Sequence, residues 1–311
     1  MTDVRIIGPD ELVFGVDDPA ACQQFLTDFG LIAVGDGRFE ALDGTAVTIR
    51  PRDDAALPPP LPTGSKLRQT IWGVEDQATL DAIGAELSRD RDVARHADGT
   101  LTCRDACGFE IAFRITRRRK LDLPAEMVNS PGARPGRPPN VIGADEDAEA
   151  RPRTLSHVVY FTPDIEAMSR FYIERLQFVV TDRFTNTGPF LRPRANLDHH
   201  VLFMIQTPAY MQGLEHLAFH MQGPTELMLA GARMVRRGYQ SFWGPGRHKF
   251  GSNWFWYFNS PMDTHVEYDA DMDLHDDSWI AREAEMGPES SQMFLFENVR
   301  KWAPGSGPGK G

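Results

Sequence analysis

The feature that most constrains the fold of this chain is an internal repeat. A shift of 146 residues pairs Asp18 with Asp164, and each copy has the pattern of an apolar strand, a helix and a second strand. The same order recurs inside each half, in the segments that begin at Leu67 and Leu214. Self-similarity at a fixed spacing indicates repeated supersecondary units, so four copies of one unit are predicted.

The order of the expected strands excludes a doubly wound parallel sheet. The stretches GTLTCRD (99–105) and GFEIAFR (108–114) follow one another without a helix between them. We therefore predict an α+β fold with two similar domains, each built on a curved, mostly antiparallel sheet with helices packed outside. Two such units facing one another would enclose a cup.

Composition predicts the domain boundaries. Residues 121–152 are rich in Pro, Gly and charge and follow neither the strand nor the helix period, as is typical of a connector. The N-terminal domain is then expected to span residues 1–120 and the C-terminal domain residues 153–300. Residues 301–311, which are rich in Gly and Pro, are expected to form a flexible tail.

Charge and cysteine content exclude several kinds of partner. The formal net charge of -11 is spread along the chain, which argues against binding nucleic acid or an anionic membrane. Cys22, Cys103 and Cys107 give an odd count without a CxxC pair, which indicates a reducing compartment and no disulfide framework. Because no stretch is apolar over the length of a bilayer, we expect a cytoplasmic protein.

The histidines lie almost entirely in the second half. Of nine in the chain, only His96 belongs to the first half. Three polar residues of the second half have no imidazole at the equivalent position of the first half. The repeat aligns His157 with Glu11, His216 with Gln69 and Glu267 with Glu110. A repeat does not explain this asymmetry, so we expect the N-terminal domain to be non-catalytic and the chemistry to lie in the C-terminal domain.

Three of these residues are predicted to bind a metal. His157 lies in SHVVYF, His216 in LEHLAFH and Glu267 in HVEYD, each at the matching place of its own unit. Side chains alternate across a strand, so three such positions on neighbouring strands can point into one cup. Two imidazoles and one carboxylate leave open positions on a non-haem ferrous ion, and a singly deprotonated catechol would neutralise its remaining charge.

Two neighbouring histidines leave alternatives open. His265 lies two residues before Glu267, on the same face of the expected strand, and is a rival ligand. His220 lies four residues after His216, and the two could bind zinc together if LEHLAFH were helical. Apolar alternation and the repeat position favour a strand at this place.

Four stretches of the second half carry a resemblance to a known family: SHVVYFTPD (156–164), FLRPRANLDHHVLFM (190–204), LEHLAFHM (214–221) and GRHKFGSNWFWYFNSPMDTHVEY (246–268). With them the chain resembles the type I extradiol catechol dioxygenases, members of the vicinal oxygen chelate superfamily with paired βαβββ modules. The resemblance implies that His157, His216 and Glu267 are the metal ligands.

The same resemblance implies roles for three residues that do not bind the metal. His200 would be the catalytic acid and base, because an imidazole exchanges protons near neutral pH. His248 and Tyr257 would donate hydrogen bonds to substrate and oxygen. The adjacent His199 is expected to face away from the site as a solvated or packing residue.

Where the family usually has other residue types, this chain has Trp256, Ser260 and Asp263. These departures are expected to change a turn and the wall of the pocket. The segment 269–300 is expected to close over the cup, with Trp279 and Ile280 in its wall.

The resemblance implies an enzyme that inserts both atoms of O2 into a catechol at Fe(2+), or at Mn(2+), and yields a muconic semialdehyde-type product. Its partners would be a catecholic substrate and O2, and the chain would form a homo-oligomer. One alternative is a non-oxidative isomerase, lyase or transferase of the same superfamily, which would need the metal but not His200, His248 and Tyr257. Another is a metal-free binding or resistance protein, which would carry no stoichiometric metal.

Overall fold

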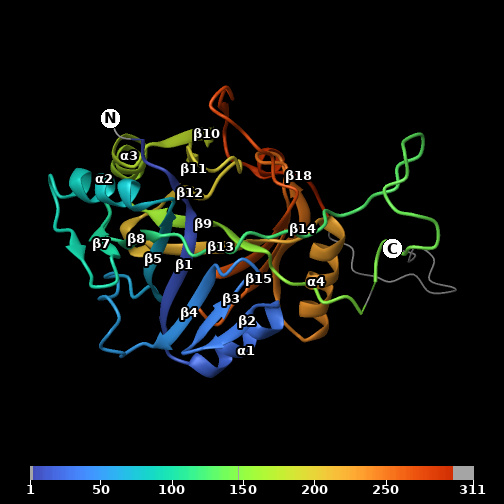
Figure 1. Cartoon of the computed structure of the whole chain (residues 1–311), viewed down its shortest axis with the longest axis horizontal. Coiled ribbons are helices and arrows are strands. Elements are labelled where there is room, and N and C mark those ends of the chain that lie inside the picture. The colour runs from blue at the N-terminus through green and yellow to red at the C-terminus, as the bar shows by residue number, and fades with distance from the viewer. Residues whose placement is uncertain (1–2, 146, 297–311) are drawn as a thin grey trace.

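The computed structural model of the chain describes residues 3–145 and 147–296, and each sequence repeat forms one βαβββ unit (Figure 1). The first unit consists of β1 (Ile6–Val16), α1 (Pro19–Phe29), β2 (Ile32–Gly35), β3 (Arg38–Glu40) and β4 (Ala46–Pro51). The second consists of β5 (Leu67–Val74), α2 (Gln77–Leu87), β6 (Ala94–Arg95), β7 (Leu101–Arg104) and β8 (Glu110–Ile115).

The second half repeats this order. The third unit has β9 (Thr154–Thr162), α3 (Ile165–Arg170) with a π-helical continuation (Phe171–Arg175), β10 (Phe178–Phe184), β11 (Gly188–Pro193) and β12 (Leu202–Gln206). A 3-10 turn (Ala209–Met211) leads to the fourth, with β13 (Gly213–His220), α4 (Pro224–Arg236), β14 (Ser241–His248), β15 (Trp254–Asn259) and β16 (His265–Ala270). Three short elements follow: β17 (Arg282–Ala284), α5 (Pro288–Ser291) and β18 (Gln292–Leu295).

The strands form two sheets of similar topology. The first has the order β2-β3-β4-β1-β5-β8-β7-β6, and the second β17-β10-β11-β12-β9-β13-β16-β15-β14-β18. In every unit the first strand pairs parallel with the last, and within each half the first strands of the two units pair antiparallel. The remaining pairs within each unit are antiparallel, so the predicted α+β fold with two similar, mostly antiparallel sheets is confirmed.

The helices begin where the repeat places an aspartate. Asp18 Oδ1 accepts a hydrogen bond from the backbone N–H of Ala21 at 3.0 Å, and Asp164 Oδ1 accepts one from Ala167 at 2.9 Å. Each carboxylate satisfies a donor that the first helical turn leaves free. The two aspartates paired by the sequence repeat are therefore equivalent helix caps.

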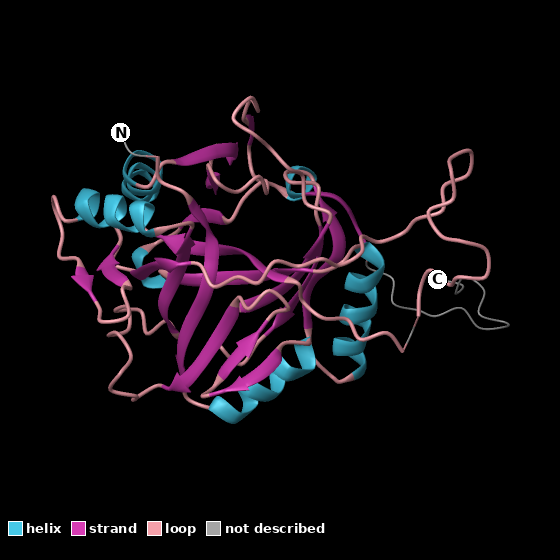
Figure 2. Ribbon diagram, in the orientation of Figure 1, coloured by secondary structure: helices cyan, strands magenta, loops and turns pink. Residues whose placement is uncertain are grey.

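Helices lie at the periphery and strands at the centre of the molecule (Figure 2). The main hydrophobic core contains residues from both halves. Tyr268 stacks on Phe29 with ring centroids 3.8 Å apart and donates a hydrogen bond to its carbonyl, and Tyr160 donates one to Thr70 at 2.7 Å. The N-terminal half therefore supports the back of the strands that carry the candidate site.

The described parts of the connector contain neither helix nor strand between β8 and β9. The domain boundaries proposed from composition stay a prediction, and the proposed tail at 301–311 lies outside the described residues. None of the helices in the described ranges is both long and apolar enough to cross a bilayer.

Candidate metal centre

The three predicted ligands lie on adjacent strands of the second sheet. His157 is on β9, His216 on β13 and Glu267 on β16. Ala218 of the middle strand pairs with His157 on one side and with Glu267 on the other. Directly opposed residues of neighbouring strands share a face of the sheet, and His216 lies two positions from Ala218 on that same face. The register thus brings the three side chains together.

Their ligand atoms form a nearly equilateral triangle. His157 Nε2 lies 3.2 Å from His216 Nε2 and 3.1 Å from Glu267 Oε2, and His216 Nε2 lies 3.3 Å from the same oxygen. All three residues are buried. In the described part of the chain, this is the one group of three or more His, Cys, Asp or Glu side chains whose spacing could hold a metal ion.

The triangle has the size that a divalent ion requires. Ligands about 2.1 Å from an ion lie roughly 3.0 Å apart at right angles and roughly 3.4 Å apart in a tetrahedron. The observed edges fall between these values. In addition, Glu267 Oε1 is buried without a hydrogen-bond partner, and an unpartnered carboxylate oxygen is costly unless a cation compensates it. The residues therefore fit a metal site.

Hydrogen bonds on the far side of each imidazole orient it. Ser156 donates to Asp269 at 2.8 Å, so its hydroxyl oxygen can accept from His157 Nδ1, which is 2.9 Å away. Glu215 accepts a hydrogen bond from His216 Nδ1. A proton held on Nδ1 leaves the Nε2 lone pair free, and this arrangement is typical of metal-binding histidines.

The carboxylates of the site stay ionised although they are buried. Burial opposes ionisation of Glu267, but hydrogen bonds from His157 and His216 hold its pKa well below the usual range. Burial likewise opposes ionisation of Glu215, yet the charge of His216 lowers its pKa to about 2. Burial would lower the pKa of His216, but Glu215 raises it to about 10. In the metal-free protein, protonated imidazoles therefore balance these carboxylates, and a bound cation would take the place of the Nε2 protons.

The rival histidines have other partners. His265 Nδ1 donates to Glu215 Oε1 at 2.8 Å, and the ring stacks on Phe242 with centroids 3.7 Å apart. It is not part of the triangle. His220 lies on a strand, as the alternation indicated, and its Nδ1 pairs with Asp269 Oδ1 at 2.5 Å. The helical zinc pair of His216 and His220 is therefore wrong.

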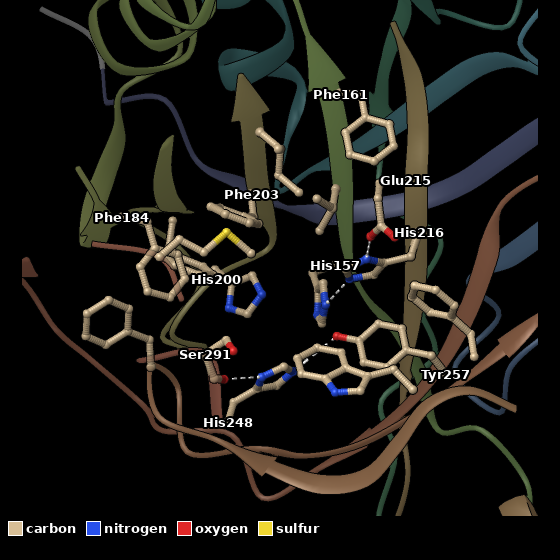
Figure 3. Close-up of a pocket in the computed structure, with 17 residues that line it drawn as sticks. His157, Phe161, Phe184, His200, Phe203, Glu215, His216, His248, Tyr257 and Ser291 are labelled. Atoms are coloured by element: carbon tan, nitrogen blue, oxygen red, sulfur yellow. Dashed lines mark hydrogen bonds and ion pairs between the residues drawn. The ribbon is translucent and has the colours of Figure 1, made fainter. Parts of the chain in front are cut away.

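His200 lies beside the triangle, with its ring centroid 4.2 Å from that of His157 (Figure 3). As expected, His199 does not line the cavity. It is buried, its Nδ1 lies 3.0 Å from His200 Nδ1, and its Nε2 lies 2.9 Å from Asp182 Oδ2. Both histidines lie in the bend before β12, where strand alternation does not hold. Sequence reasoning missed Asp182, which belongs to no motif.

This chain of hydrogen bonds sets the tautomer of His200. The Asp182 carboxylate accepts from His199 Nε2, so His199 Nδ1 is left as an acceptor for the Nδ1 proton of His200. Burial, followed by the positive charge of His157, lowers the pKa of His200 well below the usual value. Neutral His200 can therefore present an unprotonated Nε2 to the cavity.

His248 and Tyr257 lie together on the opposite side of the cavity (Figure 3). His248 Nδ1 donates to the Ser291 carbonyl at 3.0 Å, and its Nε2 lies 3.1 Å from the Tyr257 hydroxyl. Burial and then the charge of Glu267 raise the pKa of Tyr257 well above its usual value. Tyr257 thus keeps its proton and remains a hydrogen-bond donor.

The three departures from the family pattern do not reach the cavity wall. The Trp256 side chain packs on α4, where a Cβ on Gly231 would come within 2.0 Å of the indole. Ser260 accepts a hydrogen bond from the Met262 N–H within the turn before β16, and Asp263, at φ 55°, pairs with Lys66. The expectation that these residues shape the pocket is therefore wrong.

The C-terminal segment does reach the cavity, but through other residues than expected. Met286 and Ser291 line it, whereas Trp279 and Ile280 line a separate outer groove. Trp279 instead donates a hydrogen bond to the Thr181 carbonyl at 2.7 Å, and Ile280 is exposed. The prediction that Trp279 and Ile280 form the wall is wrong.

The first sheet has no comparable site. In the second sheet, Ala218 is paired with His157 on one side and with Glu267 on the other. In the first sheet, Ile71 is paired in the same way with Glu11 and with Ala112. The true equivalent of Glu267 is therefore Ala112, and the sequence pairing with Glu110 was displaced by two residues. Glu11 is buried against the side chains of Thr48, Arg38 and Arg114.

Residues 154–268 match the model of the Glyoxalase/Bleomycin resistance protein/Dioxygenase superfamily. Metapyrocatechase 2 of Cupriavidus necator is 32% identical over 150 residues, which cover 48% of this chain and 45% of that protein. The match thus spans less than half the length of this relative.

Solved structures are similar over nearly the whole chain. The Mn(II)-bound glyoxalase from Novosphingobium aromaticivorans has a TM-score of 0.72 at 23% identity, covering 93% of this chain and 90% of its own. The halotolerant catechol dioxygenase BphC has a TM-score of 0.71 at 18% identity and covers 96% of both chains. Residues 154–268 thus match a domain of the Glyoxalase/Bleomycin resistance protein/Dioxygenase superfamily, and the whole chain has the fold shared by these structures.

Proposed function

We propose that this protein is an extradiol ring-cleaving dioxygenase that inserts both atoms of O2 into a catechol and yields a muconic semialdehyde-type product. The observation that carries the proposal is the triangle of His157, His216 and Glu267, which opens into the same cavity as His200, His248 and Tyr257. The partial identity to a metapyrocatechase supports the same reaction.

We assign Fe(2+) to this site, with Mn(2+) as the alternative, since two imidazoles and a carboxylate accept either ion. The bound ion would supply Lewis-acid attraction for the two catechol oxygens and the redox centre for O2. The single carboxylate leaves the site a net charge of about +1, which favours a substrate monoanion.

The side chains around the ion would manage the protons of the reaction. His200 can accept a phenolic proton at Nε2 and return it later in the cycle, because its Nδ1 is held by His199. Tyr257 can turn its hydroxyl from His248 toward an oxygen in the cavity, where it would stabilise developing negative charge. Both residues act from fixed positions, so little reorganisation is needed during the reaction.

The competing proposal is a metal enzyme that catalyses a non-oxidative reaction. The fold shared with a Mn(II)-bound glyoxalase is the observation that favours it. Such an enzyme would need the triangle but would have no use for a neutral base at His200 and for the hydrogen-bonded pair of His248 and Tyr257 in the same cavity. A metal-free binding protein would leave a buried carboxylate oxygen of Glu267 unpartnered.

Oxygen uptake separates these functions. The protein is purified without oxygen, loaded with ferrous iron and mixed with a panel of catechols in an oxygen electrode, while product absorbance is recorded. We expect one O2 consumed per catechol cleaved. No uptake with any catechol, although iron is bound, would favour the non-oxidative enzyme.

Two further proposals concern the setting of the enzyme. Cys22, Cys103 and Cys107 form no disulfide, which supports the cytoplasm as its compartment. The family resemblance supports a homo-oligomer, and the mass of the native protein in solution tests it.

A further inference from the structure

The cavity wall beyond the metal ligands is almost entirely apolar. The cavity has a volume of about 500 Å³. Its apolar lining consists of ten side chains: Val159, Phe161, Phe184, Phe190, Phe203, Ile205, Phe242, Trp243, Phe250 and Met286. No lysine or arginine of the described chain lines it, and the one carboxylate among its lining side chains is Glu215.

Part of this wall is a hydrophobic cluster separate from the main core. It contains Val159, Phe184, Phe190, Phe203 and Phe250. The rings of Phe190 and Phe203 stack with centroids 4.0 Å apart, and those of Phe184 and Phe250 lie 4.9 Å apart. These rings come from β10, β11, β12 and the loop after β14, so the wall is a preformed packed surface.

The aromatic cluster lies next to His200, the proposed acid and base. The Phe190 ring lies 5.1 Å from the His200 ring, and Figure 3 shows Phe184 and Phe203 on the same side of the cavity as His200. A catechol placed between His200 and Tyr257 would therefore direct a substituent on its His200 side toward these rings.

The size of the cavity indicates a substituted substrate. Cavities of this volume bury most of the surface of a drug-sized ligand, whereas a bare catechol is much smaller. A bare catechol would therefore leave much of the aromatic wall in contact with water. A substituent that covers these rings gains the apolar burial that a bare catechol lacks.

The charge of the cavity indicates that this substituent is neutral. Both oxygens of Glu215 are occupied by His216 and His265, and no lysine or arginine in the described wall could pair with a substrate carboxylate. A buried charge without a partner is strongly disfavoured.

We propose that the substrates of this site are uncharged catechols with a bulky aryl or alkyl substituent, and that carboxylated catechols are excluded. This inference rests on the proposed dioxygenase function for the catechol itself. The aromatic wall and the absence of a cationic side chain in it determine the choice among catechols.

Calorimetric titration of the ferrous protein without oxygen tests this substrate class apart from turnover. The ligands are catechol, 3-phenylcatechol, 4-propylcatechol and 3-(3,4-dihydroxyphenyl)propanoate, which resembles the propyl compound but ends in a carboxylate. We expect 3-phenylcatechol to bind at least about tenfold more tightly than catechol, with a negative heat-capacity change. The carboxylate should bind at least about tenfold more weakly than 4-propylcatechol.

Equal affinity for catechol and 3-phenylcatechol, or preference for the carboxylate, would overturn the inference. Phe184→Leu should reduce the advantage of 3-phenylcatechol over catechol, whereas Phe294→Leu, outside the cavity, should preserve it. Oxygen uptake, measured in parallel, distinguishes a failure of the proposed substrate class from a failure of the proposed dioxygenase function. If the enzyme cleaves bare or carboxylated catechols in preference to 3-phenylcatechol, the substrate class is refuted but the dioxygenase function stands. If the protein binds 3-phenylcatechol preferentially but cleaves no catechol, the dioxygenase function alone is refuted.

Discussion

At the scale of single residues, the site depends on which partner each of the two nitrogens of an imidazole contacts. His157 and His216 both direct Nε2 at Glu267, while Nδ1 of His157 faces Ser156 and Nδ1 of His216 faces Glu215. Each ring therefore has one defined tautomer and orientation. The triangle is held by side chains that do not themselves bind the ion.

His216→Ala should remove the metal and activity together, because it deletes one of only three ligand side chains. The metal content of purified, iron-loaded protein, measured by plasma emission spectrometry, checks this. His265→Ala is the matched control, since His265 contacts Glu215 but lies outside the triangle, and it should keep the metal. Full metal content in His216→Ala would remove this residue from the ligand set.

His200→Ala should keep the metal and lose turnover. His200 is not in the triangle, and loss of a general acid and base typically reduces kcat by about 10²–10⁴-fold. Metal analysis and oxygen uptake on the same sample are the measurements. Metal loss equal to that of His216→Ala would show that the two roles have been assigned wrongly.

His199 is expected to act through His200 as a positioning residue. His199→Leu removes the acceptor for His200 Nδ1 and should lower kcat roughly 10–100-fold with the metal retained. His199→Gln can still accept that hydrogen bond and donate to Asp182, so it should recover part of the rate. Equal rates in the two variants would indicate that His199 only fills space.

At the scale of elements, the candidate metal centre is a consequence of strand register. β13 lies between β9 and β16, and Ala218 is opposed to a predicted ligand on each side. Cross-strand neighbours have Cβ atoms only about 4.5–5.5 Å apart, so the residue between His157 and Glu267 must be small.

Ala218→Leu should therefore lower metal affinity without deleting any ligand. The larger side chain would enter the space between His157 and Glu267 and separate their ligand atoms. Competition with a metal-binding dye measures the affinity, and Ala218→Gly, which adds no atoms, is the control. An unchanged affinity in Ala218→Leu would mean that the ion lies elsewhere.

The sequence predicted these elements where side-chain patterns are local. The alternation in LEHLAFH predicted β13 correctly, and the repeat predicted Asp18 and Asp164 as equivalent positions, which the structure shows as helix caps. It did not predict the contact of His199 with His200, because the bend before β12 breaks the alternation. Asp182 could not be found at all, since its contact with His199 depends on the packing of β10 against that bend.

At the scale of the whole molecule, one fold unit occurs four times, but the candidate metal site occurs once in the described chain. The N-terminal sheet has Glu11, Ile71 and Ala112 where the second has His157, Ala218 and Glu267. Its remaining carboxylate is neutralised by arginines. Burial opposes ionisation of Glu11, but Thr48 and Arg114 lower its pKa.

The chain should therefore bind one metal ion, and the N-terminal half none. Titration with ferrous iron under anaerobic conditions should saturate at one ion per chain. Glu11→Gln should leave this stoichiometry unchanged, because Glu11 contacts only Thr48 and arginine side chains through its carboxylate. A second tightly bound ion that Glu11→Gln abolishes would contradict the assignment of the first half as non-catalytic.

Anomalous X-ray diffraction at the iron edge, from crystals of the iron-loaded protein, tests directly whether the triangle binds the ion. We expect one strong peak per chain, about 2.0–2.2 Å from His157 Nε2, His216 Nε2 and a carboxylate oxygen of Glu267, with open positions toward the cavity. A peak elsewhere, or one that lacks any of these three ligands, would contradict it.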